Sequence, residues 1–161
     1  KNSKYRYDKD GLIAKSGKVN KLIFNQAVDN FLNLNIFKNK SLDIKDFDIF
    51  FAKGLSLENG AATITEFTAK LIADGMNVIS GNQWLICGGG RKNKYLLESI
   101  KKNLKKSNID PIDKYEIDGD FIESQAFAYL AIRSFLNLPI SFPETTGCKK
   151  PCTGGVIIKN Y

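Results

Sequence analysis

Histidine is absent from this 161-residue sequence, and cysteine occurs only three times. The lack of histidine removes serine–histidine and cysteine–histidine catalytic pairs from the chain, which argues against hydrolases of those types. Cys148 and Cys152 are four residues apart, but no second pair of ligands accompanies them to complete a zinc site. A small, odd number of cysteines does not describe a disulfide framework either. We therefore predict no metal ligands in this chain and a location in the reducing cytoplasm.

Arginine is scarce, although the chain is basic. Only three of the 24 basic residues are arginines, and the formal net charge is +7. A basic balance can indicate nucleic-acid binding, but base readout and bidentate phosphate contacts favour arginine over lysine. The densest group of lysines recurs at helical spacing, as on a solvated helix face: Lys101, Lys102, Lys105 and Lys106. We expect a lysine-rich surface and no nucleic-acid partner.

Long apolar runs are also missing. No stretch approaches the roughly 18–20 apolar residues that a membrane span needs, and the polar first ten residues do not resemble a signal peptide. We therefore expect no membrane partner. The first residue is Lys1 rather than methionine, and we expect the chain to be part of a longer protein.

Apolar periodicity predicts four helices. The first covers residues 21–34. The second opens at Asn59 and Gly60 and has apolar residues along one side, namely Ile64, Phe67, Leu71, Ile72 and Met76. The third covers residues 93–106 and is expected to bury Leu96, Leu97, Ile100 and Leu104. The fourth begins at Asp120 and is expected to bury Ile122, Phe127, Leu130 and Phe135, before Pro139 and Pro143 prevent its continuation.

Two short segments read as strands. Residues 84–87 form an apolar run that suits a strand buried on both faces, and residues 111–117 follow a predicted turn at Asp110 and Pro111. We expect polar turns over residues 1–20 and a broken, polar stretch over residues 35–45. Residues 47–52 suit a helical turn or a strand, and residues 154–159 a last strand or an extended arm. Strand, helix, strand, helix in sequence predicts an α/β layer with parallel pairing.

The run WLICGGGRKN (residues 84–93) places three glycines between a predicted strand and a predicted helix. Glycine lets the backbone approach a ligand closely, and a helix amino end offers free N–H groups and partial positive charge to a phosphate. A tight turn that needs glycine only for its dihedral angles explains the same residues equally well. The triplet matches neither the GxxxxGK phosphate loop nor a dinucleotide fingerprint. Both interpretations are therefore open at this point.

The run IDGDFIESQAFAYLA (residues 117–131) carries two carboxylates at the expected start of a helix. Asp120 and Glu123 have the spacing of a capping box, and both suit the positive end of the helix dipole. Alternatively, Glu123 points into a cleft and accepts hydrogen bonds from sugar hydroxyls, because a carboxylate accepts strongly and cannot donate. Spacing alone favours the capping interpretation.

Five segments together resemble bacterial anhydro-N-acetylmuramic acid kinases. They are YDKDGLIAKSGKVN (residues 7–20), NGAATITEFTA (59–69), ICGGGRKNKYLLESI (86–100), DGDFIESQAFAYLAIRSFLNLP (118–139) and FPETTGCKKPCTGGVI (142–157). The segments occur in the family's order, and the similarity covers essentially all of the chain. On this resemblance, residues 1–161 are identified as the carboxyl-terminal (second) domain segment of a member of that family, without its amino-terminal domain.

The resemblance implies a two-domain α/β kinase of the sugar-kinase, actin and heat-shock-chaperone superfamily, whose domains close on ATP. Such enzymes use ATP and magnesium to convert 1,6-anhydro-N-acetylmuramic acid to N-acetylmuramic acid 6-phosphate during recycling of cell-wall sugars. By the resemblance, Gly88, Gly89 and Gly90 contact the nucleotide and Asn93 lies at the adjoining helix start. Glu123 would face the anhydro-sugar. A homodimer is a further expectation.

Two departures from the family pattern limit what carries over. Relatives have a Lys-Ser-Thr-Gly-Arg-Glu loop, whereas the matching stretch here runs from Lys40 to Lys45 and keeps only its first two residues. The family's phosphate loop and its catalytic aspartate precede the first residue of this chain. We therefore assign no catalytic residue to these 161 residues.

Two alternative functions are compatible with parts of the sequence. Another small-molecule kinase of the superfamily would share the glycine turn, but not the residue 120–131 helix and the FPETTG tail together. A non-catalytic dimerisation or nucleic-acid-binding module has only the lysine surplus in its favour. Binding to a phosphate backbone would weaken steeply with salt, whereas specific sugar and nucleotide binding would be far less sensitive.

Overall fold

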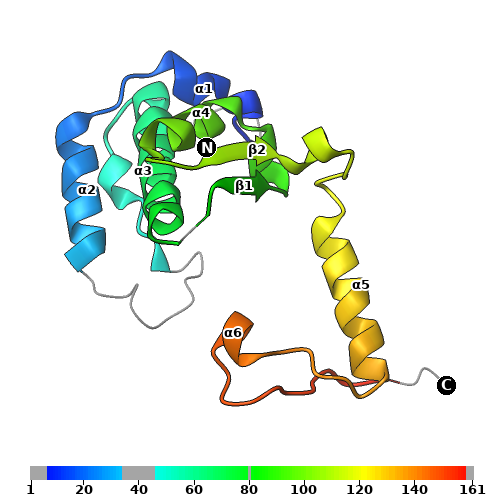
Figure 1. Ribbon diagram of the computed structural model, residues 1–161. Coiled ribbons are helices and arrows are strands. Elements are labelled where there is room, and N and C mark those ends of the chain that lie inside the picture. Colours follow the sequence, from blue (N-terminus) through cyan, green and yellow to red (C-terminus); the bar gives the residue numbers. More distant parts are fainter. Residues whose placement is uncertain (1–6, 34–45, 80, 159–161) are drawn as a thin grey trace.

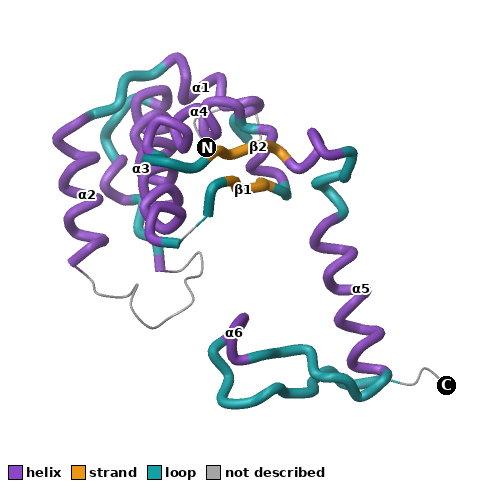
Figure 2. Tube along the Cα trace, viewed as in Figure 1, coloured by secondary structure: helices purple, strands orange, loops and turns teal. Residues whose placement is uncertain are grey.

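The computed structural model describes residues 7–33, 46–79 and 81–158 (Figure 1). These residues form a helical body with a small sheet, a long helix that extends away from the body, and a small lobe at the carboxyl end (Figures 1 and 2). The elements run in the order η1 (Lys9–Gly11), α1 (Leu12–Ser16), α2 (Lys21–Asn33), η4 (Phe50–Ala52), α3 (Leu57–Val78), β1 (Gln83–Ile86), η5 (Gly89–Lys92), α4 (Lys94–Asn103), β2 (Asn108–Pro111), η6 (Ile112–Tyr115), α5 (Ile122–Phe135) and α6 (Pro143–Thr146).

Helix α3 is the centre of the body. One hydrophobic cluster joins Phe67 of α3 to Ala27, Val28 and Phe31 of α2. A second cluster joins α3 to α4 and β2 through Ala69, Ala73, Leu97, Ile100 and Ile109. The predicted apolar face of α4 is therefore confirmed, and α2 and α3 also place apolar residues against neighbours. The prediction for α3 is confirmed only in part, because Ile72 is exposed while Phe67 and Met76 contact different clusters. Two outer positions of α2, Leu22 and Leu32, lie on its exposed side.

Polar contacts fix the first turns of α3 against the segment that joins α1 to α2. The side chain of Ser56 accepts a hydrogen bond from Asn59 N, so the helix begins before the predicted Asn59–Gly60 start. Asn59 Oδ1 in turn accepts from Lys18 N at 2.8 Å, and Thr63 Oγ1 accepts from Asn20 N at 3.0 Å. Two of the sequence segments that carry the family resemblance thus contact each other in this structure. Their role here is to hold the segment between α1 and α2 on α3.

The sheet consists of β1 and β2 in parallel, with Trp84 opposite Ile109. Side chains alternate along β1, so Trp84 and Ile86 pack toward the body while Leu85 is 46% exposed. The prediction of parallel pairing is confirmed. The prediction that this strand is buried on both faces is wrong. In the described part of the chain the body covers one face of β1, and the other face, which carries Leu85, is exposed.

The second strand lies earlier than predicted. It covers Asn108–Pro111 rather than residues 111–117, and η6 follows it directly. Ile109, which is 2% exposed, is the residue that anchors the strand in the core. Pro111 ends the strand, in keeping with its missing N–H group. Residues 7–20 also differ from the prediction of polar turns, because Asp8 accepts hydrogen bonds from Ile13 N and Ala14 N and so supports the short helix α1.

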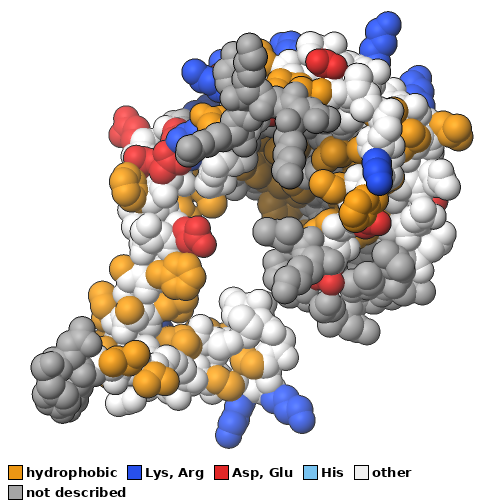
Figure 3. Space-filling model, turned by 180° about the vertical axis from the view of Figure 1, so that it is seen from behind, with side chains coloured by type: hydrophobic (Ala, Val, Ile, Leu, Met, Phe, Trp, Pro, Cys, Tyr) orange, Lys and Arg blue, Asp and Glu red, His pale blue; other side chains and the backbone are white. Residues whose placement is uncertain are grey.

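Helix α5 leaves the body and carries large exposed apolar side chains. No residue of α5 is buried in the described structure, so the prediction that Ile122, Phe127, Leu130 and Phe135 are core residues is wrong there. Phe127 is 65% exposed and Phe135 is 68% exposed. We call the exposed apolar residues of this helix and its flanks the α5 apolar face: Phe121, Phe127, Tyr129, Ile132, Phe135 and Leu136. Figure 3 shows apolar side chains along this arm and an open space between the arm and the body.

The carboxyl-terminal lobe is held to the end of α5 by polar contacts. Arg133 Nε donates to Pro139 O at 2.6 Å, and Ser134 Oγ donates to Gly154 O. A single antiparallel bridge joins Ser141 and Cys152. Residues 154–158 belong to no helix or strand, so the predicted last strand is not formed over them, and residue 159 lies outside the described residues.

Residues 47–52 contain η4, which decides between the two predictions for that segment in favour of a helical turn. The predicted polar stretch over residues 35–45, including Lys40–Lys45, lies outside the described residues. Within the part of the chain that the structure describes, none of the helices combines the length and apolar character of a membrane-spanning segment.

Candidate functional site

The glycine turn joins β1 to α4 at the surface. Its three glycines differ in backbone conformation and in the space around Cα. Gly88 has φ 73° and ψ −179°, a conformation that is essentially restricted to glycine. At Gly89 an added Cβ would meet no atom within 4 Å, and at Gly90 only Leu96 Cδ2 at 4.0 Å. Neither of these two glycines has a positive φ. The turn hypothesis therefore accounts for Gly88 but not for Gly89 or Gly90, which both face open space.

The amino end of the helix that follows the turn packs against Gly11, where an added Cβ would overlap the Asn93 side chain and lie 2.7 Å from Tyr95 Cβ. Asn93 is the N-cap residue of α4, and its Oδ1 accepts from Leu96 N at 2.9 Å. The predicted position of Asn93 at the helix start is confirmed. The amino end of a helix carries partial positive charge and free N–H groups, which favour an anionic group nearby.

Arg91 follows the glycines directly and is the charged centre of the site. Its side chain is only 5% exposed. Arg91 Nε and Nη2 donate to the two carboxylate oxygens of Asp113 at 2.6 and 2.9 Å. Arg91 Nη1 donates to Asp120 Oδ1 at 2.6 Å and to Gly88 O at 3.0 Å. The guanidinium thus joins the glycine turn to η6 and to the segment that leads into α5.

The loop before α5 is built around this arginine. Gly119 is buried, and a Cβ added there would lie 2.7 Å from Arg91 Cδ and 2.8 Å from Arg91 Cζ. Gly88 N also donates to Gly119 O at 3.0 Å, which is a direct backbone link between the turn and the loop. Sequence reasoning missed Arg91, Asp113 and Gly119. The only available signal was an arginine placed directly after three glycines in a chain with three arginines.

The predicted capping box at the start of α5 is not formed. Phe121 is the N-cap residue and provides no side-chain hydrogen bond. Asp120 instead pairs with Arg91 and, at 2.5 Å, with Lys92 Nζ. Glu123 lies in the first turn of α5, is exposed, and makes no hydrogen bond or ion pair with any residue that the structure describes. Its carboxylate is therefore available to a ligand.

The pKa values of the two aspartates follow from their contact with Arg91. Hydrogen bonds from Arg91 lower the pKa of Asp113 from 3.8 to about 2. Hydrogen bonds from Arg91 and then Lys92 lower the pKa of Asp120 to about 2 as well. The same bonds raise the pKa of Arg91. Because both carboxyl pKa values are depressed in the folded state, the stability that these contacts contribute is complete above about pH 4 and is lost as the pH falls through about 2.

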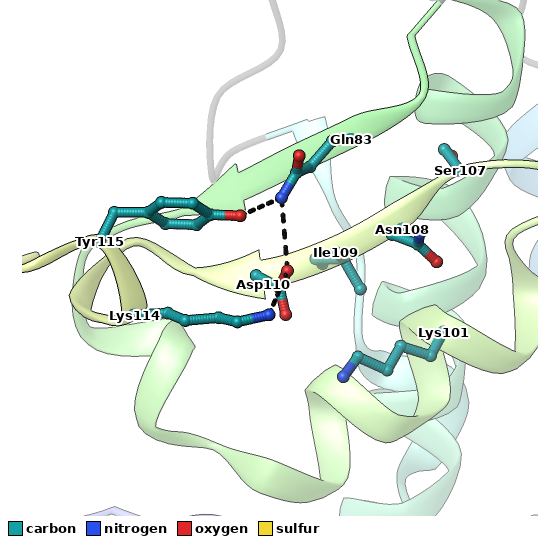
Figure 4. Close-up of a pocket in the computed structure, with 8 residues that line it drawn as sticks. All are labelled: Gln83, Lys101, Ser107, Asn108, Ile109, Asp110, Lys114 and Tyr115. Atoms are coloured by element: carbon teal, nitrogen blue, oxygen red, sulfur yellow. Dashed lines mark hydrogen bonds and ion pairs between the residues drawn. The ribbon is translucent and has the colours of Figure 1, made fainter.

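A separate polar cavity of about 540 Å³ lies at the free edge of β2 (Figure 4). Gln83 Nε2 contacts Tyr115 Oη and Asp110 Oδ2, and Lys114 Nζ lies 3.1 Å from the same Asp110 oxygen. Lys101 of α4 also lines the cavity. None of the residues predicted to contact nucleotide or sugar lines this cavity. Its polar groups are largely bonded to one another, and we assign it no ligand.

The described residues offer no set of metal ligands. No group of three or more cysteine, aspartate or glutamate side chains among them could hold an ion, and Cys87, Cys148 and Cys152 are free thiols. The carboxylates nearest the glycine turn, Asp113 and Asp120, are engaged by Arg91. This donor set does not fit a protein-held magnesium ion, which prefers carboxylates that are free to coordinate. We derive no chemical step through a metal from these residues.

Comparison with known proteins matches this chain to one family. The family model described as anhydro-N-acetylmuramic acid kinase matches residues 1–160. A protein of that name from Pelagibacter ubique is 51% identical over 168 aligned positions, which cover 100% of this chain and 45% of the relative. Proteins of the same name from Zymomonas mobilis and Rhodospirillum rubrum are 40% and 38% identical and are covered over 41% and 40% of their lengths. The chain thus spans less than half the length of these relatives.

Proposed function

Because this chain belongs to the anhydro-N-acetylmuramic acid kinase family, we propose that it is the carboxyl-terminal portion of an ATP-dependent kinase. The substrate would be 1,6-anhydro-N-acetylmuramic acid, and the product N-acetylmuramic acid 6-phosphate. The observation that carries the proposal is the family match over residues 1–160. The α/β arrangement with a parallel strand pair is compatible with the second domain of an actin-like kinase. We place the reaction in the cytoplasm, in recycling of cell-wall sugars.

The glycine turn is the proposed nucleotide side of the site. Gly89 and Gly90 leave open space where a side chain would otherwise stand, and the amino end of α4 adds favourable electrostatics. Gly88 supports this role by setting the direction of the turn, and Asn93 by capping the helix. ATP is the cofactor that this arrangement suits. Magnesium would enter with the nucleotide's phosphates, as it commonly does.

Glu123 is the proposed sugar contact. Its carboxylate has no partner among the described residues and stands at the start of α5. Arg91 joins the residues directly before this helix to the glycine turn. A free carboxylate can accept hydrogen bonds from two sugar hydroxyls, and such charged hydrogen bonds are stronger than neutral ones. The phosphate loop and the catalytic aspartate would come from the preceding part of the longer protein. In that protein the α5 apolar face would also be covered.

We expect this chain by itself not to phosphorylate the anhydro-sugar, because no residue here supplies the phosphate loop or the catalytic base. A coupled assay with ATP, magnesium and the anhydro-sugar measures this directly. The control is a protein of the relatives' full length that contains this chain, which we expect to be active. Turnover by the chain alone near that of the full-length control would contradict our account of the site. An inactive full-length control would refute the proposed function itself.

A second candidate role, self-association, is favoured by the exposed apolar residues. The α5 apolar face exposes six large apolar side chains, and contiguous exposed apolar surface is typical of interaction sites. In addition, β1 has a strand neighbour on only one side within the described sheet. We expect the isolated chain to form dimers or larger species as its concentration rises, as measured by sedimentation velocity. Replacing Phe127 and Phe135 by glutamate should reduce this association, whereas Leu22→Glu on α2 should not. A monomer at every concentration would show that these surfaces need no cover.

A further inference from the structure

Helix α5 has an unusual mode of attachment to the body. Neither of the hydrophobic clusters of the body contains an α5 side chain among the described residues, and no α5 residue is buried there. Within residues 7–33, 46–79 and 81–158, apolar packing therefore does not set the direction of the helix. The contacts that precede it are polar and converge on a single buried side chain, Arg91.

The contacts of Arg91 and of its neighbour Lys92 place Arg91 at this junction. Its Nε and Nη2 atoms form a bidentate pair with Asp113, and its Nη1 atom bonds Asp120, two residues before α5. The same Nη1 atom bonds Gly88 O on the glycine turn. Gly119 lies against the aliphatic part of Arg91, where a Cβ would overlap Cδ. Lys92 bonds the second oxygen of Asp120 from the solvent side.

We propose that Arg91 is a positioning residue, which sets the direction of α5 and thereby the place of Glu123 relative to the glycine turn. The proposal rests on the proposed function only in taking Glu123 as the sugar side and the turn as the nucleotide side. A guanidinium suits the task because its planar donors hold two carboxylates and a carbonyl in fixed relative directions. A lysine would supply one charge but no such plane.

The arrangement also joins the two sides of the site mechanically. The turn is bonded to the α5 leader twice, through Gly88 O to Arg91 and through Gly88 N to Gly119 O at 3.0 Å. A displacement of Gly88 is therefore transmitted to Gly119, which directly precedes Asp120. In a kinase whose two substrates must lie in line for phosphoryl transfer, errors in such positions reduce turnover even when both substrates bind.

The test is a distance measurement between the body and α5 in this chain. Spin labels are placed at Lys102→Cys on α4 and Ala131→Cys on α5, with the three native cysteines replaced by serine and the sample diluted with unlabelled chain. Pulsed electron paramagnetic resonance then gives the distribution of distances. The proposal predicts one narrow peak, which becomes broad in Asp120→Ala and in Arg91→Lys. Asp74→Asn removes an ion pair on α3 and should leave the peak narrow.

Circular dichroism and steady-state kinetics of Asp120→Ala complete the test. Arg91→Lys alters a buried side chain and could prevent folding, but Asp120 is 46% exposed, so Asp120→Ala should keep the circular dichroism spectrum of the body. An unchanged narrow peak in a folded Asp120→Ala chain overturns the proposal. In the full-length protein, Asp120→Ala should lower kcat by a larger factor than it raises the KM for ATP. An inactive full-length parent would refute the kinase function, while the distance measurement would still decide the role of Arg91.

Discussion

Glu123→Gln in the full-length protein is expected to weaken binding of the anhydro-sugar by about tenfold to a hundredfold. A hydrogen bond to a charged group contributes roughly 1.5–3 kcal/mol, and every 1.4 kcal/mol is about tenfold in affinity. Glutamine keeps the shape of the side chain and can still accept one hydrogen bond. The change therefore removes the charge and little else.

The competing explanation for Glu123 is weaker in the structure than in the sequence. A capping box needs Asp120 as N-cap, but Asp120 is bonded to Arg91 and Lys92, and Phe121 occupies the cap position. What is left of the local role is an interaction with the helix dipole, worth about 0.3–1 kcal/mol at an exposed position. We therefore expect the melting temperature to change little while sugar affinity falls.

Isothermal titration calorimetry with the anhydro-sugar gives the affinity, and a thermal scan of each variant gives the stability. Glu58→Gln is a matched control, because Glu58 is also an exposed glutamate in the first turn of a helix, α3. The control should bind the sugar like the parent. Unaltered sugar affinity in Glu123→Gln, with intact ATP affinity, would mean that Glu123 does not contact the sugar.

The elements that local pattern predicted well are those whose partner also lies in the chain. The spacing of Phe67, Leu97 and Ile100 predicted helices with a buried face. The prediction holds because α2, α4 and β2 are present to cover those side chains. The same reasoning failed for α5. Its apolar positions have the spacing of a buried helix, yet Phe127 and Phe135 are exposed because no described element covers them. Periodicity predicts which face is apolar, not whether a partner is present.

The errors at the site have a similar cause. The spacing of Asp120 and Glu123 satisfied a local rule, but Arg91, which is 29 residues away in sequence, binds Asp120 more effectively than the helix end could. The second strand was misplaced because Asp110 and Pro111 were interpreted as a turn before it, whereas both residues belong to the strand that carries Ile109 into the core. Long-range pairing decided both cases, and no window of neighbouring residues records it.

Substitutions in the glycine turn are expected to have the second large effect. Gly88 must be glycine for its backbone conformation, whereas neither the backbone nor a neighbouring atom requires glycine at the other two positions. Gly88 adopts φ 73° with an extended ψ, so Gly88→Ala should destabilise the fold by about 1–3 kcal/mol. Gly89 has no positive φ, and a Cβ there would meet nothing within 4 Å. Gly89→Ala should therefore leave stability unchanged or raise it by about 0.4–1 kcal/mol, since it reduces the freedom of the unfolded chain.

We accordingly expect Gly89→Val in the full-length protein to fold normally and to bind ATP at least about tenfold more weakly, which corresponds to 1.4 kcal/mol or more. The valine methyl groups would stand in the open space that we assign to the nucleotide, while sugar binding at Glu123 should persist. Nucleotide titrations of the parent, Gly89→Ala and Gly89→Val form a graded series, because the loss should grow with the volume of the side chain. If Gly89→Val is folded and binds ATP like the parent, the space above Gly89 is solvent and the nucleotide lies elsewhere. In that case only Gly88 would need to be glycine, and the triplet would be a turn between β1 and α4.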